Sequence, residues 1–330
     1  MADISRADAL ALLATQELDS IIKPETQSSA ALSAFRTTRM SAGVTRQPVL
    51  ASLPTAGWVT DNNSSDASGV KPTSKVTWGN KELIAEEMAV IIPVHENTIA
   101  DSKFDLWGEV RPLVAQEFGR VLDDAVFFGI NKPSTWLDPA LVPGAIAAEN
   151  YIVEGFLPDG TASVDLAEDI NEAFGLVEDD EFDVNVAFTG RFLRRRLRGL
   201  RDADNAPIYL DGLRSDGNTA SIYGQDLHYI KNGGWHRDEA LLLVGDRDKV
   251  VIGIREDVQV KLLDQATLGT GVNQINLAER DMVALRFKFR VAFATAYSTA
   301  RVGGSASDYP FAIIAPTDPV DADGVPATDV

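Results

Sequence analysis

The sequence predicts an α+β fold organised around one long amphipathic helix. Three patterns lead to this prediction: apolar residues at helical spacing over 103–128, strict alternation over 282–293, and two strand-like segments around a polar turn over 49–78. Short helices and strands alternate between residues 166 and 263. With 330 residues, 45% of them hydrophobic, the chain can fill one large or two medium domains.

The helix at 103–128 is the longest element that we expect, and at about 1.5 Å per residue it would span roughly 35 to 40 Å. Its predicted buried stripe consists of Leu106, Val110, Leu113, Val114, Phe118, Val121, Leu122, Ala125 and Val126. The polar residues Glu109, Gln116, Glu117, Arg120, Asp123 and Asp124 lie mostly off that stripe. Pro112 removes one helical hydrogen bond, so the helix either begins near this proline or kinks there.

Two different segments form the N-terminal part of the chain. Residues 5–22 predict an amphipathic helix with Ser5 as its N-cap, and Pro24 ends it. Residues 26–46 are rich in Ser, Ala and Thr and contain few large apolar side chains, which indicates an arm that needs another surface to order it. The alternative is an ordinary disordered leader.

A long hairpin is expected next. Residues 49–59 and 75–78 have strand character, and small polar and turn-forming residues lie between them. A hairpin with about 13 residues per arm, at about 3.3 Å each, would project roughly 40 Å, too far to pack wholly on its own domain. We therefore expect this loop to lie on a partner. The strand that follows alternates at Ile84, Met88, Val90, Ile92 and Val94.

The second half of the chain predicts alternating short elements after a crossing rich in proline and glycine. These elements are a helix at 166–178, a strand at 184–188, a helix from Thr189, and strands at 228–231, 240–244, 250–254 and 258–263. The clearest strand, 282–293, has one apolar face and one basic face with Arg286, Lys288 and Arg290. From Pro316 the chain is acidic and rich in proline, which indicates an extended surface tail.

The composition excludes several classes of protein. The 30 basic and 49 acidic residues give a net charge of −19, which argues against a surface that grips nucleic acid over its whole area. Without cysteine there is no disulfide framework and no thiolate zinc site, and three histidines limit imidazole chemistry. Because no run approaches the ~20 apolar residues that cross a bilayer, and the N-terminus lacks a signal pattern, we expect a soluble protein kept in the cytoplasm.

Catalytic patterns are nearly absent. A lone G-x-G at 269–271 lacks the third glycine of a dinucleotide site, and no P-loop occurs. His228 and His236 are either structural histidines or metal ligands that lack a third partner at usable spacing. The acidic run 178–183 lacks the glycine of a calcium loop, and the paired carboxylates at 123–124 are unspecific in so acidic a chain. We therefore predict no enzyme, no cofactor and no metal.

The strongest charge cluster lies on the helix that follows Thr189. Its predicted exposed side carries Arg191, Arg194, Arg195 and Arg198, opposite a buried stripe of Leu193, Leu197 and Leu200. Because like charges this close repel, the cluster is either a solvated face or a contact with an acidic surface, most simply a second copy of this chain. Nucleic acid is a third option, weakened by the lack of interleaved aromatics. The basic face of strand 282–293 is likewise either solvated or a contact row.

The order of these parts resembles the major capsid proteins of tailed bacteriophages, which have the Hong Kong 97-like fold. The resemblance covers roughly residues 44–314. Its local matches are KELIAEEMAVIIPVHENTIADS before the long helix, DDAVFFGIN at its end, FTGRFLRRRLRGLRDADNAPIYL followed by YGQDLHYI, and LLLVGDRDKVVIGIREDVQVKLL followed by ERDMVALRFKFRVAFATAYSTARV. None of these is a catalytic signature, but together they are specific.

The resemblance implies a division of the chain. We expect an N-terminal arm at 1–46, an extended loop hairpin at 47–81, a peripheral domain at 82–138 and 278–296 with the long spine helix, an axial α/β domain at 139–277 and 297–316, and a C-terminal tail at 317–330. The candidate inter-subunit contact residues are Trp58, Asp61, Asp66, Lys71, Lys75, Trp78, Arg191, Arg194, Arg195, Arg198, Arg286, Lys288 and Arg290. Some family members crosslink a loop lysine, but no acceptor can be matched here.

The resemblance also implies a function. The chain is expected to self-assemble as pentamers and hexamers into an icosahedral shell around double-stranded DNA, in the host cytoplasm, without sequence-specific DNA binding. The expected partners are a separate scaffolding protein, a portal, and optional decoration or minor capsid proteins. The alternatives are an encapsulin-like compartment shell that holds enzymes and, more remotely, a carboxylate-dependent hydrolase.

Overall fold

The computed structural model describes residues 29–52, 54, 56, 73–102, 105–158, 160–201, 204–205, 209, 221–269, 274–295 and 308–316. The helices are α2 (Ala30–Ala34), α3 (Glu96–Asp101), α4 (Leu106–Asp123), the π-helical turn η1 (Asp124–Phe128), α5 (Leu141–Ala147), α6 (Leu166–Asp179), α7 (Arg191–Gly199) and the 3-10 turns η2 (Arg247–Lys249) and η4 (Ala278–Arg280). The predicted helix at 5–22 and the tail at 317–330 lie outside the described residues.

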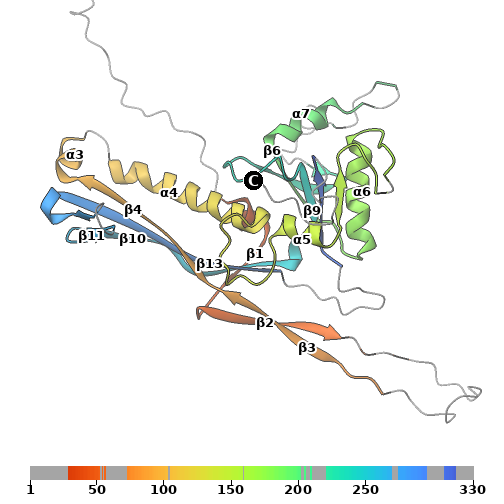
Figure 1. The fold of residues 1–330 in the computed structure, drawn as a ribbon, viewed down its shortest axis with the longest axis horizontal. Coiled ribbons are helices and arrows are strands. Elements are labelled where there is room, and N and C mark those ends of the chain that lie inside the picture. The colour runs from red at the N-terminus through yellow and green to blue at the C-terminus, as the bar shows by residue number, and fades with distance from the viewer. Residues whose placement is uncertain are drawn as a thin grey trace, which may run out of the picture.

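The strands form two large sheets and two short hairpins (Figure 1). In chain order they are β1 (Arg36–Arg39), β2 (Val44–Ser52), β3 (Thr77–Ile84), β4 (Glu86–His95), β5 (Tyr151–Val153), β6 (Val186–Gly190), β7 (Ser221–Ile222), β8 (Gln225–Ile230), β9 (Leu242–Gly245), β10 (Val250–Leu263), β11 (Thr267–Leu268), β12 (Ile275–Asn276), β13 (Met282–Thr295) and β14 (Phe311–Ala315). The α+β class predicted from the sequence is therefore observed.

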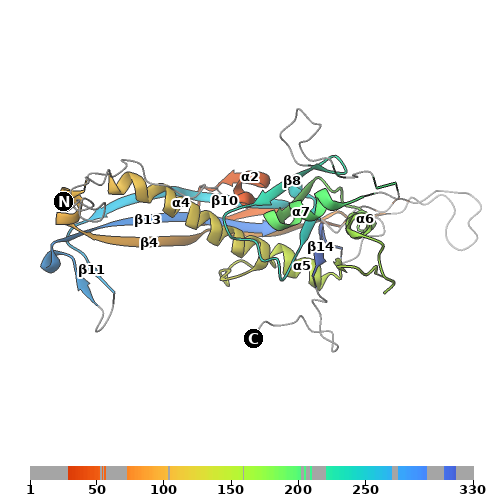
Figure 2. The same ribbon diagram turned by 90° about the horizontal axis from the view of Figure 1, so that it is seen from above.

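The first sheet has four strands in the order β1-β10-β13-β4, and α4 runs along it (Figure 2). The two strands predicted at 250–254 and 258–263 are one continuous strand, β10. Its pairing with β13 shifts register between Ile254 and Glu256 and again between Glu256 and Gln259. These irregularities absorb the polar residues that interrupt the apolar alternation, which is how a β-bulge keeps a strand paired across a pattern break.

The long helix begins at Leu106 and continues through η1 to Phe128, so its predicted end is confirmed. Pro112 lies inside α4, and the prediction that the helix begins there is wrong. The proline ring is exposed, which leaves the carbonyl one turn earlier open to water in place of the lost hydrogen bond. Gly129 ends the helix in the left-handed region, at φ 76°.

The apolar stripe of α4 packs on the inner face of the sheet. Val114, Phe118 and Leu122 are buried, and the ring of Phe118 stacks on that of Phe289 with 6.4 Å between centroids. Leu113, predicted in the stripe, is 44% exposed. The alternation of β13 is confirmed, because its apolar face lies in this core.

The second sheet has six strands in the order β5-β14-β9-β6-β8-β7 and two covered faces. On strand β6, Val186 and Phe188 point into the core shared with α4, whereas Ala187 points into a second core with α6 and α7. The helix predicted at 166–178 is confirmed as α6. Helix α5 and strand β14 were not predicted as separate elements.

Two parts of the chain lie in a different sheet from the one expected. Residues 29–39, within the predicted arm, form α2 and β1; Ala31 and Phe35 are buried in the main core, and β1 pairs with β10. The surface that orders this half of the arm is thus its own subunit. Strand β10, within the predicted axial range, pairs with β13 instead, because its 14 residues match the length of that strand.

Two glycines offer a matched test of this packing. A Cβ atom at Gly245 in β9 would overlap the ring of Phe311 and the carbonyl oxygen of Pro310, whereas one at Gly175 in α6 would meet nothing within 4 Å. We expect Gly245→Ala to lower the free energy of unfolding by about 2 kcal/mol through overpacking. Gly175→Ala should raise it by about 0.5 kcal/mol through helix propensity. Urea unfolding of both variants checks the pair, and equal midpoints would contradict the packing described.

Candidate assembly surfaces

The hairpin of β2 and β3 projects from the body of the molecule (Figure 1). Its strands pair antiparallel from Val44 and Ile84 to Ser52 and Thr77. A two-stranded ribbon without a core is marginally stable alone, yet this one carries Trp78 at 70% exposure. Lys75 lies exposed just before β3. The predicted tip residues Trp58, Asp61, Asp66 and Lys71 lie outside the described residues.

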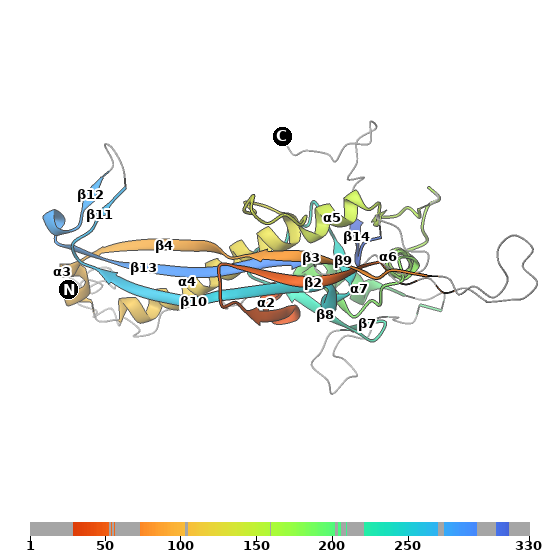
Figure 3. The same ribbon diagram turned by 90° about the horizontal axis from the view of Figure 1, so that it is seen from below.

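At the opposite end of the molecule, β11 and β12 form a second, shorter hairpin (Figure 3). The neighbouring outer half of β10 lacks a strand partner on one side among the described residues, because β1 pairs only with residues 251–254. This open edge exposes Val258, Val260 and Leu262 by 43%, 40% and 57%. Sequence reasoning recognised the strand but missed its open edge, which only the pairing order reveals.

The arginine face of α7 is arranged as predicted. Leu193 and Leu197 are buried, and Arg191, Arg194, Arg195 and Arg198 are exposed on the other side of the helix. The Arg194 guanidinium lies over the ring of Tyr229, 5.6 Å from its centroid, and Arg198 Nε donates to the Arg194 carbonyl oxygen at 3.3 Å. Six arginines between residues 191 and 201 thus gather at one end of the molecule.

The basic row on β13 is largely neutralised within the subunit. Lys288 Nζ lies 3.0 Å from a carboxylate oxygen of Glu87 on β4 and 3.3 Å from one of Glu256 on β10. Arg290 Nη1 lies 3.3 Å from Glu256 as well. The hydrogen bond to Glu87 raises the pKa of Lys288, and the pair with Glu256 adds to it while burial opposes it. Arg286 sits between Ile91 and Lys261 in the sheet register.

A buried carboxylate at the end of α4 is the main polar feature that the sequence did not reveal. Asp123 is fully buried and accepts hydrogen bonds from Ser29 Oγ at 2.5 Å, the amides of Ala30 and Ala31 at 2.9 and 3.0 Å, and Asn232 Nδ2 at 2.6 Å. We call this group the Asp123 clasp. Its helical spacing alone placed Asp123 off the apolar stripe, in the position of a solvated residue.

Burial raises the pKa of Asp123 above its ordinary value of 3.8, although the hydrogen bonds from Ser29, the two amides and Asn232 act in the opposite direction. A raised pKa means that the folded chain holds this proton more tightly than the unfolded chain. The contribution of this group to stability therefore falls as the pH rises above 3.8.

The histidines and the other carboxylates have structural surroundings. His228 stacks on Phe188 at 5.5 Å, and burial lowers its pKa while Asp226 opposes the shift. His236 Nε2 lies 3.3 Å from Asp124 Oδ1. Asp180, from the acidic run, accepts hydrogen bonds from Asn150 Nδ2 and the Tyr309 amide. No three His, Asp or Glu side chains in the described ranges are grouped so as to hold a metal ion.

The exposed chemistry of the molecule therefore lies on a projecting ribbon, an open strand edge and a cationic helix. Such features contact macromolecular surfaces, and an elongated body that carries them at both ends is the architecture of a subunit that builds a larger assembly. None of the helices in the described ranges is long and apolar enough to span a bilayer.

Comparisons with known proteins specify that assembly. Residues 11–304 match the model of the phage capsid family, and the chain belongs to this family. It is 29% identical over 248 residues to the major capsid protein of Staphylococcus phage 80alpha, which covers 73% of this chain and 68% of that protein.

Solved structures agree with the family. A chain from Microbacterium phage Oxtober96 is 75% identical with a TM-score of 0.83, covering 95% of this chain and 99% of that one. A chain from Mycobacterium phage Cain is 41% identical with a TM-score of 0.82, covering 96% and 99%. The predicted Hong Kong 97-like fold and the predicted function as a major capsid protein of a tailed phage, located in the virion capsid, are confirmed.

Proposed function

We propose that the chain assembles as pentamers and hexamers into an icosahedral shell, and that the projecting hairpin and the arginine face of α7 are its main subunit contacts. The exposed Trp78 on a ribbon without a core of its own carries this proposal. Burying an aromatic side chain of this size at an interface stabilises association, and aromatic side chains dominate many interface centres. The basic row of β13 is a weaker candidate, since two of its members are paired within the subunit.

The domain division is part of the same proposal. The four-stranded sheet with α4 corresponds to the peripheral domain, and the six-stranded sheet with α5, α6 and α7 corresponds to the axial domain at the centre of a capsomer. The placement of α7 in the axial part would bring the arginine faces of several copies around one centre. Their repulsion then requires acidic groups of the neighbours between them, which a chain of net charge −19 offers.

The further partners follow from this function. We propose a separate scaffolding protein, a portal and DNA enclosed without sequence-specific binding, with assembly in the host cytoplasm and no catalytic step by this chain. The acidic balance suits an inner wall that does not retain packaged DNA. An encapsulin-like compartment is the second candidate, and filled virions that contain this chain would decide against it.

Removal of the hairpin tip tests the proposal. We expect deletion of residues Asn62–Val70 to leave the thermal unfolding of the subunit unchanged and to abolish closed shells in negative-stain microscopy, because the tip contacts a neighbour and not the core. A variant in which the same nine positions carry Gly and Ser is the matched control for loop length. A deletion that unfolds the free subunit, or that leaves normal shells, contradicts the role assigned to the hairpin.

A further inference from the structure

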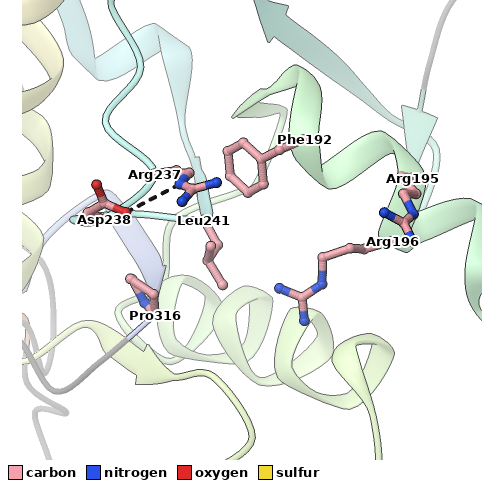
Figure 4. A pocket seen from close by; sticks show the side chains of 7 residues that line it. All are labelled: Phe192, Arg195, Arg196, Arg237, Asp238, Leu241 and Pro316. Carbon is pink, nitrogen blue, oxygen red and sulfur yellow. Dashed lines mark hydrogen bonds and ion pairs between the residues drawn. The ribbon is translucent and has the colours of Figure 1, made fainter.

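A cleft of about 550 Å³ lies beside the first turns of α7 (Figure 4). Its walls include Phe192, Arg195, Arg196, Arg237, Leu241 and Pro316. Leu241 is buried in the core under α6, and Phe192 packs against that core. The cleft therefore combines apolar walls with guanidinium groups, a combination that suits an extended peptide with acidic side chains.

The positive charge of the cleft is only partly neutralised. Arg196 is ion-paired with Glu154, and Arg237 Nε lies 3.3 Å from Asp238 in a pair whose side chains are 71% and 91% exposed. So exposed a pair is weak and exchanges readily with another carboxylate. Arg195 is exposed and makes no ion pair with any residue that the structure describes. The cleft thus holds one guanidinium more than its carboxylates, next to the remaining arginines of α7.

An acidic segment of the same chain begins at the cleft. Pro316, which follows β14, is both a wall of the cleft and the last described residue. Residues 317–330 carry aspartates at 318, 321, 323 and 329 and contain neither lysine nor arginine. Six extended residues span at most about 20 Å, so the first three aspartates can reach across the cleft. Because the segment is tethered at the wall, its effective concentration there is of millimolar order.

We propose that residues 317–330 bind in the arginine cleft of their own subunit, with the aspartates at 318, 321 and 323 against Arg195 and Arg237. The bound segment neutralises cations at the base of α7 and thereby lowers the repulsion within the arginine face. It also competes with the acidic surface of a neighbouring copy for the same arginines. The segment acts as an internal counter-charge that a neighbour displaces or leaves in place.

Disulfide trapping in the full chain tests this binding, because the sequence contains no cysteine to interfere. The variant Asp238→Cys with Ala322→Cys keeps every arginine of the cleft and every aspartate of the segment. On mild oxidation we expect a bond within one chain, seen by denaturing non-reducing electrophoresis and peptide mass mapping. Asp101→Cys with Ala322→Cys is the distant control, since α3 lies at the other end of the molecule (Figure 1).

Charge dependence separates binding from tethered diffusion. Replacing the aspartates at 318, 321 and 323 with asparagine should slow the Asp238→Cys crosslink about fivefold, the size expected for a few exposed ion pairs. Salt at 1 M, where the Debye length is about 3 Å, should slow it similarly. An unchanged rate with the neutral segment, or equally fast reaction of the control pair, overturns the proposal. A crosslinked dimer in place of the internal bond also overturns it and assigns the cleft to the neighbour's segment. These outcomes are read within one chain, so they do not depend on whether shells form.

Discussion

Asp123→Ala is expected to lower the free energy of unfolding by about 3 kcal/mol, because it leaves four buried donors without their acceptor. Relief from holding a buried carboxylate offsets part of the loss, which is why the full sum of four hydrogen bonds is not expected. Because the donors include the first amides of α2, the loss should also release residues 29–34 from the end of α4. Urea unfolding at pH 7 and proteolysis of this segment measure the two effects.

Two variants bracket this result. Asp123→Asn keeps the shape and one acceptor oxygen, so we expect about half of the loss. Glu117→Ala removes an exposed carboxylate of the same helix, which is paired with Arg120, and should change stability by less than about 0.5 kcal/mol. If Asp123→Ala is as stable as Glu117→Ala, the clasp does not hold α2 in solution.

Reversal of the charge on three arginines of α7 is expected to prevent capsomer formation. Changing Arg194, Arg195 and Arg198 to Glu shifts the net charge by six, from −19 to −25, and turns attraction for an acidic neighbour into repulsion. The side chains are exposed, so the free subunit should fold with unchanged thermal stability. Sedimentation velocity and negative-stain microscopy of the expressed chain measure assembly.

A second triple variant separates position from net charge. Arg111, Lys261 and Arg280 are also exposed, and changing them to Glu produces the same shift in net charge away from α7. Loss of assembly in the first variant alone supports the arginine face as a contact. Intact hexamers and pentamers in the first variant would show that these arginines are merely solvated.

Local periodicity carried most of the fold prediction. The helix predicted at 166–178 and the strand predicted at 282–293 match α6 and β13 to within two residues, because each buries one face along its whole length. The failures have physical reasons. Helix α5 contains Pro143 and Gly144, which read as loop residues, yet Gly144 is required where the Tyr309 ring lies against the helix.

The candidate site was harder to predict, because its features depend on contacts between distant residues. The Leu and Arg pattern of α7 is local, so its exposed face was predictable. The Asp123 clasp joins residues 94 positions apart, and the pairing of Glu256 with Lys288 depends on strand order. No spacing in one sequence contains this information. The sequence therefore indicated which residues are charged but not which of them are already paired.

The main core has a mechanical consequence for a subunit of this shape. It runs without a break from Phe289 in the four-stranded sheet, through η1, to Phe188 and Ile313 in the six-stranded sheet. Close-packed interiors have low compressibility and transmit strain. The body therefore behaves as a rigid lever, so a push on one end by a neighbour tilts the other end instead of bending the middle. Subunits built in this way can change the curvature of a surface by small rotations at their contacts while each keeps its own fold.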